Sequence, residues 1–317
     1  MKTDYKKFIK SCVIVVLSLI IIDTAFGFVA DRLVSKMNVY SGDISKRKHV
    51  LDRINEDIQI VGTSRATCHF VSSLLRDSIN AYTDHNYSLY NGGINGGGFL
   101  GTIMSTESTI KQHNVGKLLI LETSESFLYP DKDISNQIWR YSYLYKTNPI
   151  VKEYSDSFSL KTKIEMMSNL YRFNTHLGGI IKSDFSKAKP NDGYYPLYGI
   201  MKINHNKNNQ IIHTTISPYL FSNFVRVLDL CKKERVNIVI VSPPSYGNDK
   251  DTYYEKQNVL GKLCKEKNIP YINMIDEEYF EQHPELFKDK LHLNDNGAKA
   301  FTKMFFERLK PYLDSMK

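Results

Sequence analysis

Ser64 is the first residue whose type and setting could support nucleophilic chemistry. It follows an apolar run directly, in the order Val61-Gly62-Thr63-Ser64, and a helical pattern begins after it. A strand that ends at a glycine and turns into a helix exposes the next side chain at the edge of a sheet, where the free N–H groups of the helix start also point. A serine hydroxyl there can reach a substrate and has donors for a developing oxyanion, although serine is also a common helix N-cap.

The matching acid–base residues lie near the C-terminus, in the segment Phe287-Lys288-Asp289-Lys290-Leu291-His292. An aspartate three residues before a histidine, in a loop ahead of the last helix, lets both side chains point inward. The histidine can then take the serine proton through one ring nitrogen while the aspartate holds the proton on the other. We therefore predict that Ser64, His292 and Asp289 form the catalytic triad of a serine esterase or acyltransferase.

A sheet has to position these residues, and the sequence indicates one. Short apolar runs bounded by Gly, Asn and Pro are typical of parallel strands buried on both faces. They occupy Asp57–Val61, Tyr87–Tyr90, Lys117–Leu121, Val236–Val241 and Pro270–Met274. Helical patterns lie between or after them, at Arg65–Leu75, Phe99–Gln112, Pro218–Glu234, Asp251–Lys267 and Asp295–Leu313. This alternation predicts an α/β fold with a parallel sheet of about five strands and helices on both faces, whose active site lies at the carboxyl ends of the strands.

Together these motifs resemble the SGNH (GDSL-like) hydrolase superfamily. Gly62-Thr63-Ser64-Arg65-Ala66 is similar to its block I, and the segment from Asp289 to Gly297 is similar to its block V. The segment Asn91–Gly96 resembles block II. The resemblance implies a flavodoxin-like three-layer sandwich, with the triad given above. It also implies an oxyanion hole formed by the backbone N–H groups of Ser64 and Gly96, with Gly93 and Gly97 as alternatives to Gly96.

One position departs from the family pattern. Block III normally supplies an Asn side chain to the oxyanion hole, but this chain reads Leu121-Glu122-Thr123-Ser124 after its third strand. Ser124 or Thr123 could donate instead, or the hole could have only its two backbone donors; losing one such donor costs about 10²–10³ in rate in other enzymes. In this departure the chain resembles the DltD and alginate O-acetylation type members of the family, which are membrane-anchored and transfer acyl groups beside a membrane-bound O-acyltransferase.

The segment Pro130–Ile216 interrupts the strand–helix alternation and is too long for an ordinary connection. We predict a partly helical insertion between strands three and four, including a helix at Lys161–Arg172, which serves either as a lid or substrate platform or as a structural insert. Tyr194 and Tyr195 in it could stack on sugar rings or simply pack the loop. Arg65 could bind an acidic substrate or lie on a helix surface.

The N-terminus predicts a membrane anchor. A basic tail over residues 1–10 precedes an apolar run over 11–30, which at ~1.5 Å per residue spans a ~30 Å hydrocarbon core. Asp23 interrupts this run, at an insertion cost of about 2–3 kcal/mol. The flanking lysines place the N-terminus in the cytoplasm and the rest outside. A cleaved signal peptide is the alternative. Residues 31–56 are predicted to form a polar, partly helical stalk before a catalytic domain at 57–317.

Composition limits the function classes. The 317 residues carry a formal charge of +8, without a nucleic-acid-binding motif, and the four cysteines show no metal-binding spacing. We predict a single-pass protein of the cytoplasmic membrane with an extracytoplasmic domain that needs no cofactor or metal. Its function would be an acyl-esterase or O-acyltransferase, O-acetyl on family grounds, acting on an envelope or secreted glycan. The alternatives are a plain lipase or small-ester hydrolase, and a non-catalytic glycan-binding or scaffolding partner of a membrane O-acyltransferase.

Overall fold

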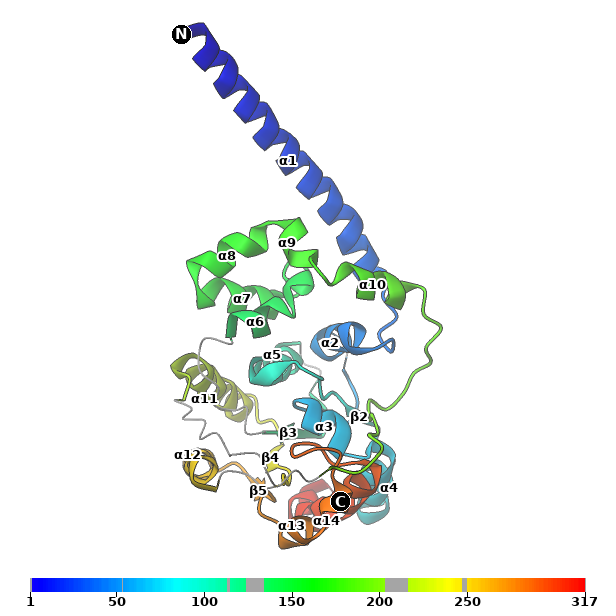
Figure 1. The fold of residues 1–317 in the computed structure, drawn as a ribbon. Coiled ribbons are helices and arrows are strands. Elements are labelled where there is room, and N and C mark those ends of the chain that lie inside the picture. The colour runs from blue at the N-terminus through cyan, green and yellow to red at the C-terminus, as the bar shows by residue number, and fades with distance from the viewer. Residues whose placement is uncertain are drawn as a thin grey trace. The chain divides into compact units, whose positions relative to one another are not determined.

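The computed structural model describes residues 2–52, 54–112, 115–123, 134–202, 216–246 and 250–316. The chain forms two compact units (Figure 1). The helical unit consists of Met1–Ser45 and Ile138–Ala188, and the sheet unit of Lys46–Gln137 and Lys189–Lys317. Most of the segment predicted as an insertion therefore belongs with the N-terminal helix. The predicted catalytic domain over 57–317, with an insertion at 130–216, stays a prediction.

One parallel sheet organises the sheet unit. Its strands pair in the order β2-β1-β3-β4-β5, all parallel, which is the flavodoxin-like order of a doubly wound sheet. The residues of β1, β3 and β4 are buried throughout, as expected for strands covered on both faces. The predicted α/β class and strand positions are confirmed. The strands are β1 (Ile58–Val61), β2 (Leu89–Asn91), β3 (Leu118–Glu122), β4 (Ile238–Ser242) and β5 (Tyr271–Asn273).

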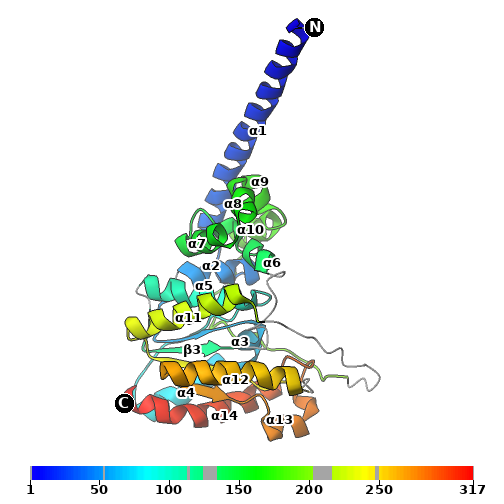
Figure 2. The same ribbon diagram turned by 90° about the vertical axis from the view of Figure 1, so that its left-hand side faces the viewer.

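Helices cover both faces of this sheet (Figure 2). On one face α5 (Gly98–Lys111) packs against α11 (Pro218–Lys233); on the other, α14 (Asp295–Leu313) packs against α4 (Ser72–Thr83), with α12 (Lys250–Lys267) beside them. The three-layer arrangement follows from these contacts. Shorter elements of the unit are α3 (Ser64–His69), α13 (Glu278–Gln282), η4 (Pro284–Leu286) and η5 (Asp314–Met316).

The helix predicted over Arg65–Leu75 is instead two helices, α3 and α4. The chain is extended at Phe70 and Val71, between them. The Val71 N–H donates to Thr302 Oγ1 at 3.0 Å, and the Phe70 carbonyl accepts from Asn91 Nδ2 at 3.2 Å. Because side chains from distant segments satisfy these backbone groups, the helix can break where local periodicity alone predicts continuity.

In the helical unit, polar caps define the helices. Asn148, Ser159 and Ser168 accept backbone N–H groups at the starts of α7 (Pro149–Phe158), α8 (Leu160–Met167) and α9 (Asn169–Phe173). The Ser168 cap explains why the predicted helix Lys161–Arg172 is divided between α8 and α9. The unit also contains η3 (Ser142–Leu144) and α10 (Leu177–Asp184), and α6 (Ile134–Trp139) crosses the boundary between the units.

The N-terminal helix α1 (Lys2–Lys36) is longer than the predicted anchor. Its stretch Tyr5–Lys36 has a mean hydropathy of 2.6 in its most apolar window, of which only 6% is buried. A helix of this length and composition can be a membrane anchor or a signal sequence. The segment predicted as a partly helical stalk contains the end of α1 and the helix α2 (Asp43–Asp52), and Val50, Leu51 and Ile54 in it are buried.

Candidate active site

The structure places Ser64 at the start of α3, directly after β1. The N-cap of that helix is Thr63, whose hydroxyl accepts the Arg65 N–H, so the Ser64 hydroxyl is not used as the cap. Instead, Ser64 Oγ lies 2.8 Å from His292 Nε2. The two sequence motifs therefore meet at the carboxyl edge of the sheet, within hydrogen-bonding distance of each other.

Asp289 lies on the other side of the His292 ring. Both of its carboxylate oxygens are 3.0 Å from His292 Nδ1, and Oδ1 also accepts the N–H groups of Leu291 and His292. Partial burial would raise the pKa of Asp289, but the hydrogen bonds from His292 and from the Leu291 backbone outweigh it and lower the pKa below its ordinary value. An anionic Asp289 favours a proton on Nδ1, which leaves Nε2 with a lone pair toward Ser64.

His69 supports the loop that carries His292. It is fully buried, and its Nε2 accepts the Leu293 N–H at 3.1 Å. Burial lowers the pKa of His69 well below its ordinary value, and the charges of Arg65 and His292 act in the same direction. His69 is therefore a neutral acceptor. Its burial and this contact make His69 a support of the His292 loop and not a surface residue.

Glu122 contacts Thr63, the residue before the nucleophile, and was not singled out from the sequence. It ends β3 with no exposed surface, and its Oε2 accepts the Thr63 N–H at 2.8 Å and the Thr63 hydroxyl at 2.9 Å. Burial raises the pKa of Glu122, while nearby Arg65 and the hydrogen bonds from Thr63 and Ala66 oppose this rise. An acidic residue that closes a buried apolar strand is the sequence signal that could have identified it.

Glycine at position 62 is required for steric reasons beside Glu122. A Cβ at this position would lie 2.6 Å from the Cβ atoms of Glu122 and Ala66, closer than packed atoms allow. The glycine of the Gly-Thr-Ser motif thus permits β1, β3 and α3 to approach, and this approach sets the position of Ser64.

Arg65 does not lie on a helix surface as the sequence suggested, and its binding of an acidic substrate stays a prediction. Its side chain is buried, and its Nη2 donates to the carbonyl oxygens of Pro243 and Pro244 after β4. The guanidinium thus ties α3 to the neighbouring strand's carboxyl end. Among the residues that the structure describes, Arg65 Nε and Nη1 and Glu122 Oε1 have no hydrogen-bond partner.

The block II loop packs against α3. Asn91 Nδ2 donates to the Ala66 carbonyl at 2.7 Å, and the Ile94 N–H donates to the Gly62 carbonyl at 3.0 Å. Gly96 follows in an exposed turn with φ +61°, where glycine is favoured. Donation from Gly96 and Ser64 N–H groups to an oxyanion stays a prediction. Ser124 lies outside the described residues.

The alternative donor Thr123 belongs to the sheet. It is buried, and its hydroxyl lies 3.3 Å from the Val241 carbonyl and 2.9 Å from Ser242 Oγ. These partners connect the ends of β3 and β4, so Thr123 serves strand pairing in this conformation.

Residues 189–202, the C-terminal part of the predicted insertion, do lie beside both motifs. The Tyr195 N–H donates to the Thr67 carbonyl at 3.0 Å, and the Asp295 N–H donates to the Leu197 carbonyl at 2.7 Å. Tyr194 is packed in place, with its hydroxyl 2.9 Å from Asp295 Oδ1, and burial raises its pKa. Tyr195 is 60% exposed. A role in substrate binding stays a prediction for both tyrosines.

No family model matches the chain, and no curated protein matches its sequence. Several solved structures are similar to it, of which we describe two. One is an acetyl xylan esterase with 12% sequence identity, covering 80% of this chain and 98% of that one, at a TM-score of 0.43. The other is a lipase/acylhydrolase from Enterococcus faecalis with 9% identity, covering 80% and 95%, at a TM-score of 0.42. Similarity this distant does not determine an activity, so we infer function from the chain's own residues.

Proposed function

We propose that the protein is a serine acyl-esterase or O-acyltransferase that works through an acyl-enzyme on Ser64. The observation that carries this proposal is the continuous contact from Ser64 Oγ to His292 Nε2, at 2.8 Å, and from His292 Nδ1 to Asp289, at 3.0 Å. A nucleophile, a base within hydrogen-bonding reach and a third group that orients the base are the parts that acyl transfer requires.

The reaction follows from this geometry. His292 Nε2 accepts the Ser64 proton as Oγ attacks the ester carbonyl, and the resulting imidazolium donates that proton to the leaving alcohol when the C–O bond breaks. A water molecule or a sugar hydroxyl then gives its proton to His292 and attacks the acyl carbonyl. The ester bond to Ser64 breaks, and His292 returns the proton to Ser64 Oγ. Asp289 remains anionic through both steps, because its pKa is lowered, and it stabilises the imidazolium.

The oxyanion of each tetrahedral intermediate would form at the start of α3. Unsatisfied N–H groups and the positive end of the helix dipole favour negative charge there. We assign the Ser64 and Gly96 N–H groups to this role, with Ser124 as a third donor. Glu122 contributes by holding Thr63, and thus the helix start, in position.

We further propose that the substrate is an acylated glycan outside the cytoplasm, with acetyl as the acyl group. Within α1, Lys6, Lys7 and Lys10 precede the apolar stretch, and such a charge distribution favours a cytoplasmic N-terminus. The resemblance to the DltD and alginate O-acetylation type members supports the glycan acceptor and a membrane-bound O-acyltransferase as partner.

A fluorophosphonate probe tests the nucleophile directly. The wild type and a Ser73→Ala control, which alters an exposed serine of α4, should be labelled, whereas Ser64→Ala should not. Labelling of Ser64→Ala at the wild-type level would refute the assignment. Incubation with an acetyl donor and an oligosaccharide then separates the alternatives: transfer to sugar indicates an acyltransferase, release of acetate alone an esterase, and binding without turnover a non-catalytic partner.

A further inference from the structure

One face of the helical unit is apolar but exposed. On α8 the side chains of Leu160, Ile164 and Met167 are 73%, 58% and 69% exposed. Their spacing of four and three residues places them on one side of the helix, while Thr162 and Met166 on the opposite side are buried. Leu170 at the start of α9 is a further half-exposed apolar residue. We call Leu160, Ile164, Met167 and Leu170 the apolar face.

Charges flank this face. Lys161 is 83% exposed and lies 3.7 Å from Glu165, and Lys163 is also exposed. Long lysine side chains beside exposed leucine, isoleucine and methionine are typical of helices that lie in the interfacial plane of a membrane, with their apolar side in the lipid and their charges in the headgroups.

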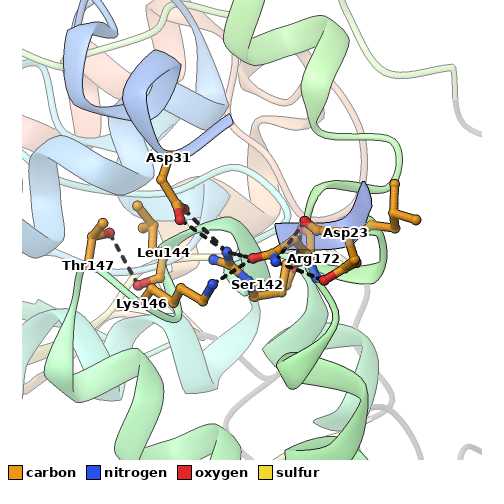
Figure 3. Close-up of polar contacts among 9 residues, drawn as sticks. Asp23, Asp31, Ser142, Leu144, Lys146, Thr147 and Arg172 are labelled. Carbon is orange, nitrogen blue, oxygen red and sulfur yellow. Dashed lines mark hydrogen bonds and ion pairs between the residues drawn. The ribbon is translucent and has the colours of Figure 1, made fainter. Parts of the chain in front are cut away.

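The apolar face is fixed to α1 through Asp23. The Asp23 carboxylate accepts hydrogen bonds from the Ser168 hydroxyl and the Asn169 N–H, each at 2.9 Å. It also accepts one from the Leu170 N–H, at 2.8 Å. About two turns further along α1, Asp31 pairs with Arg172 of α9 at 3.3 Å; in Figure 3 the Asp31 carboxylate points at the Arg172 guanidinium, with Asp23 nearby. The junction of α8 and α9 thus lies at the depth of Asp23 along α1.

The length of α1 places this depth within the outer half of a bilayer. Residues 11–22, which follow Lys6, Lys7 and Lys10, are exposed around the whole helix. A hydrocarbon core of ~30 Å takes about twenty residues at ~1.5 Å per residue, so a bilayer that begins at Ser11 extends past Asp23 to about Ala30. Phe28 and Val29, past Asp23, are still 73% and 57% exposed.

We propose that the apolar face rests in the outer leaflet of the same bilayer that α1 spans, so that the helical unit is seated in lipid and not merely tethered to it. α1 exposes apolar side chains as far as Val29, and α9 is hydrogen-bonded to α1 at Asp23. The apolar face therefore lies beside a part of α1 that faces lipid, which commits it to a lipid partner. The hydrogen bonds to Asp23 reduce the cost of a carboxylate at this depth, because its acceptors are satisfied within the protein. The proposal rests on the proposed membrane anchor, and it is independent of the chemistry at Ser64.

Spin labels on the full-length chain test it, in vesicles of phosphatidylethanolamine and phosphatidylglycerol. Labels are attached to Ile164→Cys and Met167→Cys on the apolar face and to Glu153→Cys on an exposed position of α7, each with Cys12→Ser to remove the exposed native thiol. We expect the ratio of accessibility to oxygen over a water-soluble nickel chelate to be several-fold higher at 164 and 167 than at 153.

Equal ratios at the three positions would overturn the proposal. It would also be overturned if the labels at 164 and 167 were shielded from the nickel chelate only when a membrane acyltransferase is co-expressed. Fluorophosphonate labelling of each variant reports separately on the sheet unit. A failure of lipid contact is therefore distinguishable from a failure of the proposed chemistry.

Discussion

Two carboxylates, one in each unit, hold the start of a short helix. Glu122 accepts the Thr63 N–H and hydroxyl before α3, and Asp23 accepts the Asn169 and Leu170 N–H groups of α9. Glu122 is fully buried at the end of a strand, whereas Asp23 lies on an outer helix and is partly exposed. The same contact therefore serves two purposes: it fixes a nucleophile in the sheet unit, and it docks an apolar helix in the other.

The two carboxylates differ in how strongly the protein depends on them. A fully buried carboxyl group has no water around it to replace its contacts, so every group that it holds depends on it. Asp23 is only partly enclosed by protein, and its partner Leu170 is half exposed, so its loss leaves fewer enclosed donors unsatisfied. Removal of Glu122 should therefore cost more than removal of Asp23, and each loss should stay within its own unit.

Glu122→Ala should have the largest effect. It leaves the buried Thr63 N–H and hydroxyl without their acceptor, at a cost of about 3–5 kcal/mol in the free energy of unfolding of the sheet unit. Urea unfolding of the full-length chain in detergent measures this, with Glu122→Gln as the matched control that keeps an oxygen acceptor but cannot ionise. Unchanged unfolding of Glu122→Ala would contradict the proposed role, and reduced probe labelling at Ser64 would support it.

Asp23→Ala should have a smaller effect, of about 1–3 kcal/mol, because it leaves the Asn169 and Leu170 N–H groups without an acceptor. Hydrogen exchange of α9 in the vesicle-bound protein should become faster, while exchange in β1 and β3 stays the same. Asp23→Asn retains one oxygen and should fall between Asp23→Ala and the wild type. Equal acceleration in both units would show that the caps are not independent.

The sheet and the meeting of the three predicted triad residues could be predicted because their signals are local. The five strands are short buried runs, and Ser64 and His292 each lie in a short motif beside an element boundary. Because both faces of each strand are buried, the run is apolar throughout, and it can be recognised in the sequence without knowing which strand it pairs with.

The missed features depend on partners far along the chain. The burial of Arg65 is decided by the Pro243 and Pro244 carbonyls, and the role of Glu122 by Thr63. Likewise, residues 138–188 could not be assigned to the unit of α1, because the Asp23 and Asp31 contacts that join them leave no periodic pattern in the sequence.

The last prediction uses pH to separate the units, since His69 belongs to the sheet unit. Its pKa is well below the ordinary value in the folded protein, and an unfolded histidine has a pKa of about 6.5. Below about pH 6.5 the unfolded chain therefore binds a proton that the folded chain does not. The stability of the sheet unit should fall as the pH falls from 6.5 to 5, by up to about 1.4 kcal/mol per pH unit.

His69→Gln is the matched variant, because its side-chain oxygen can accept the Leu293 N–H but does not titrate. Burial raises the pKa of Glu122, so this residue binds a proton more readily in the folded state than in the unfolded state. Its protonation therefore raises the stability of the sheet unit as the pH falls, opposite to the effect of His69. The test is therefore the difference in slope between His69→Gln and the wild type, measured by urea unfolding at each pH. A flatter slope in the variant supports a buried neutral His69, and identical slopes would show that His69 takes its proton without leaving the fold.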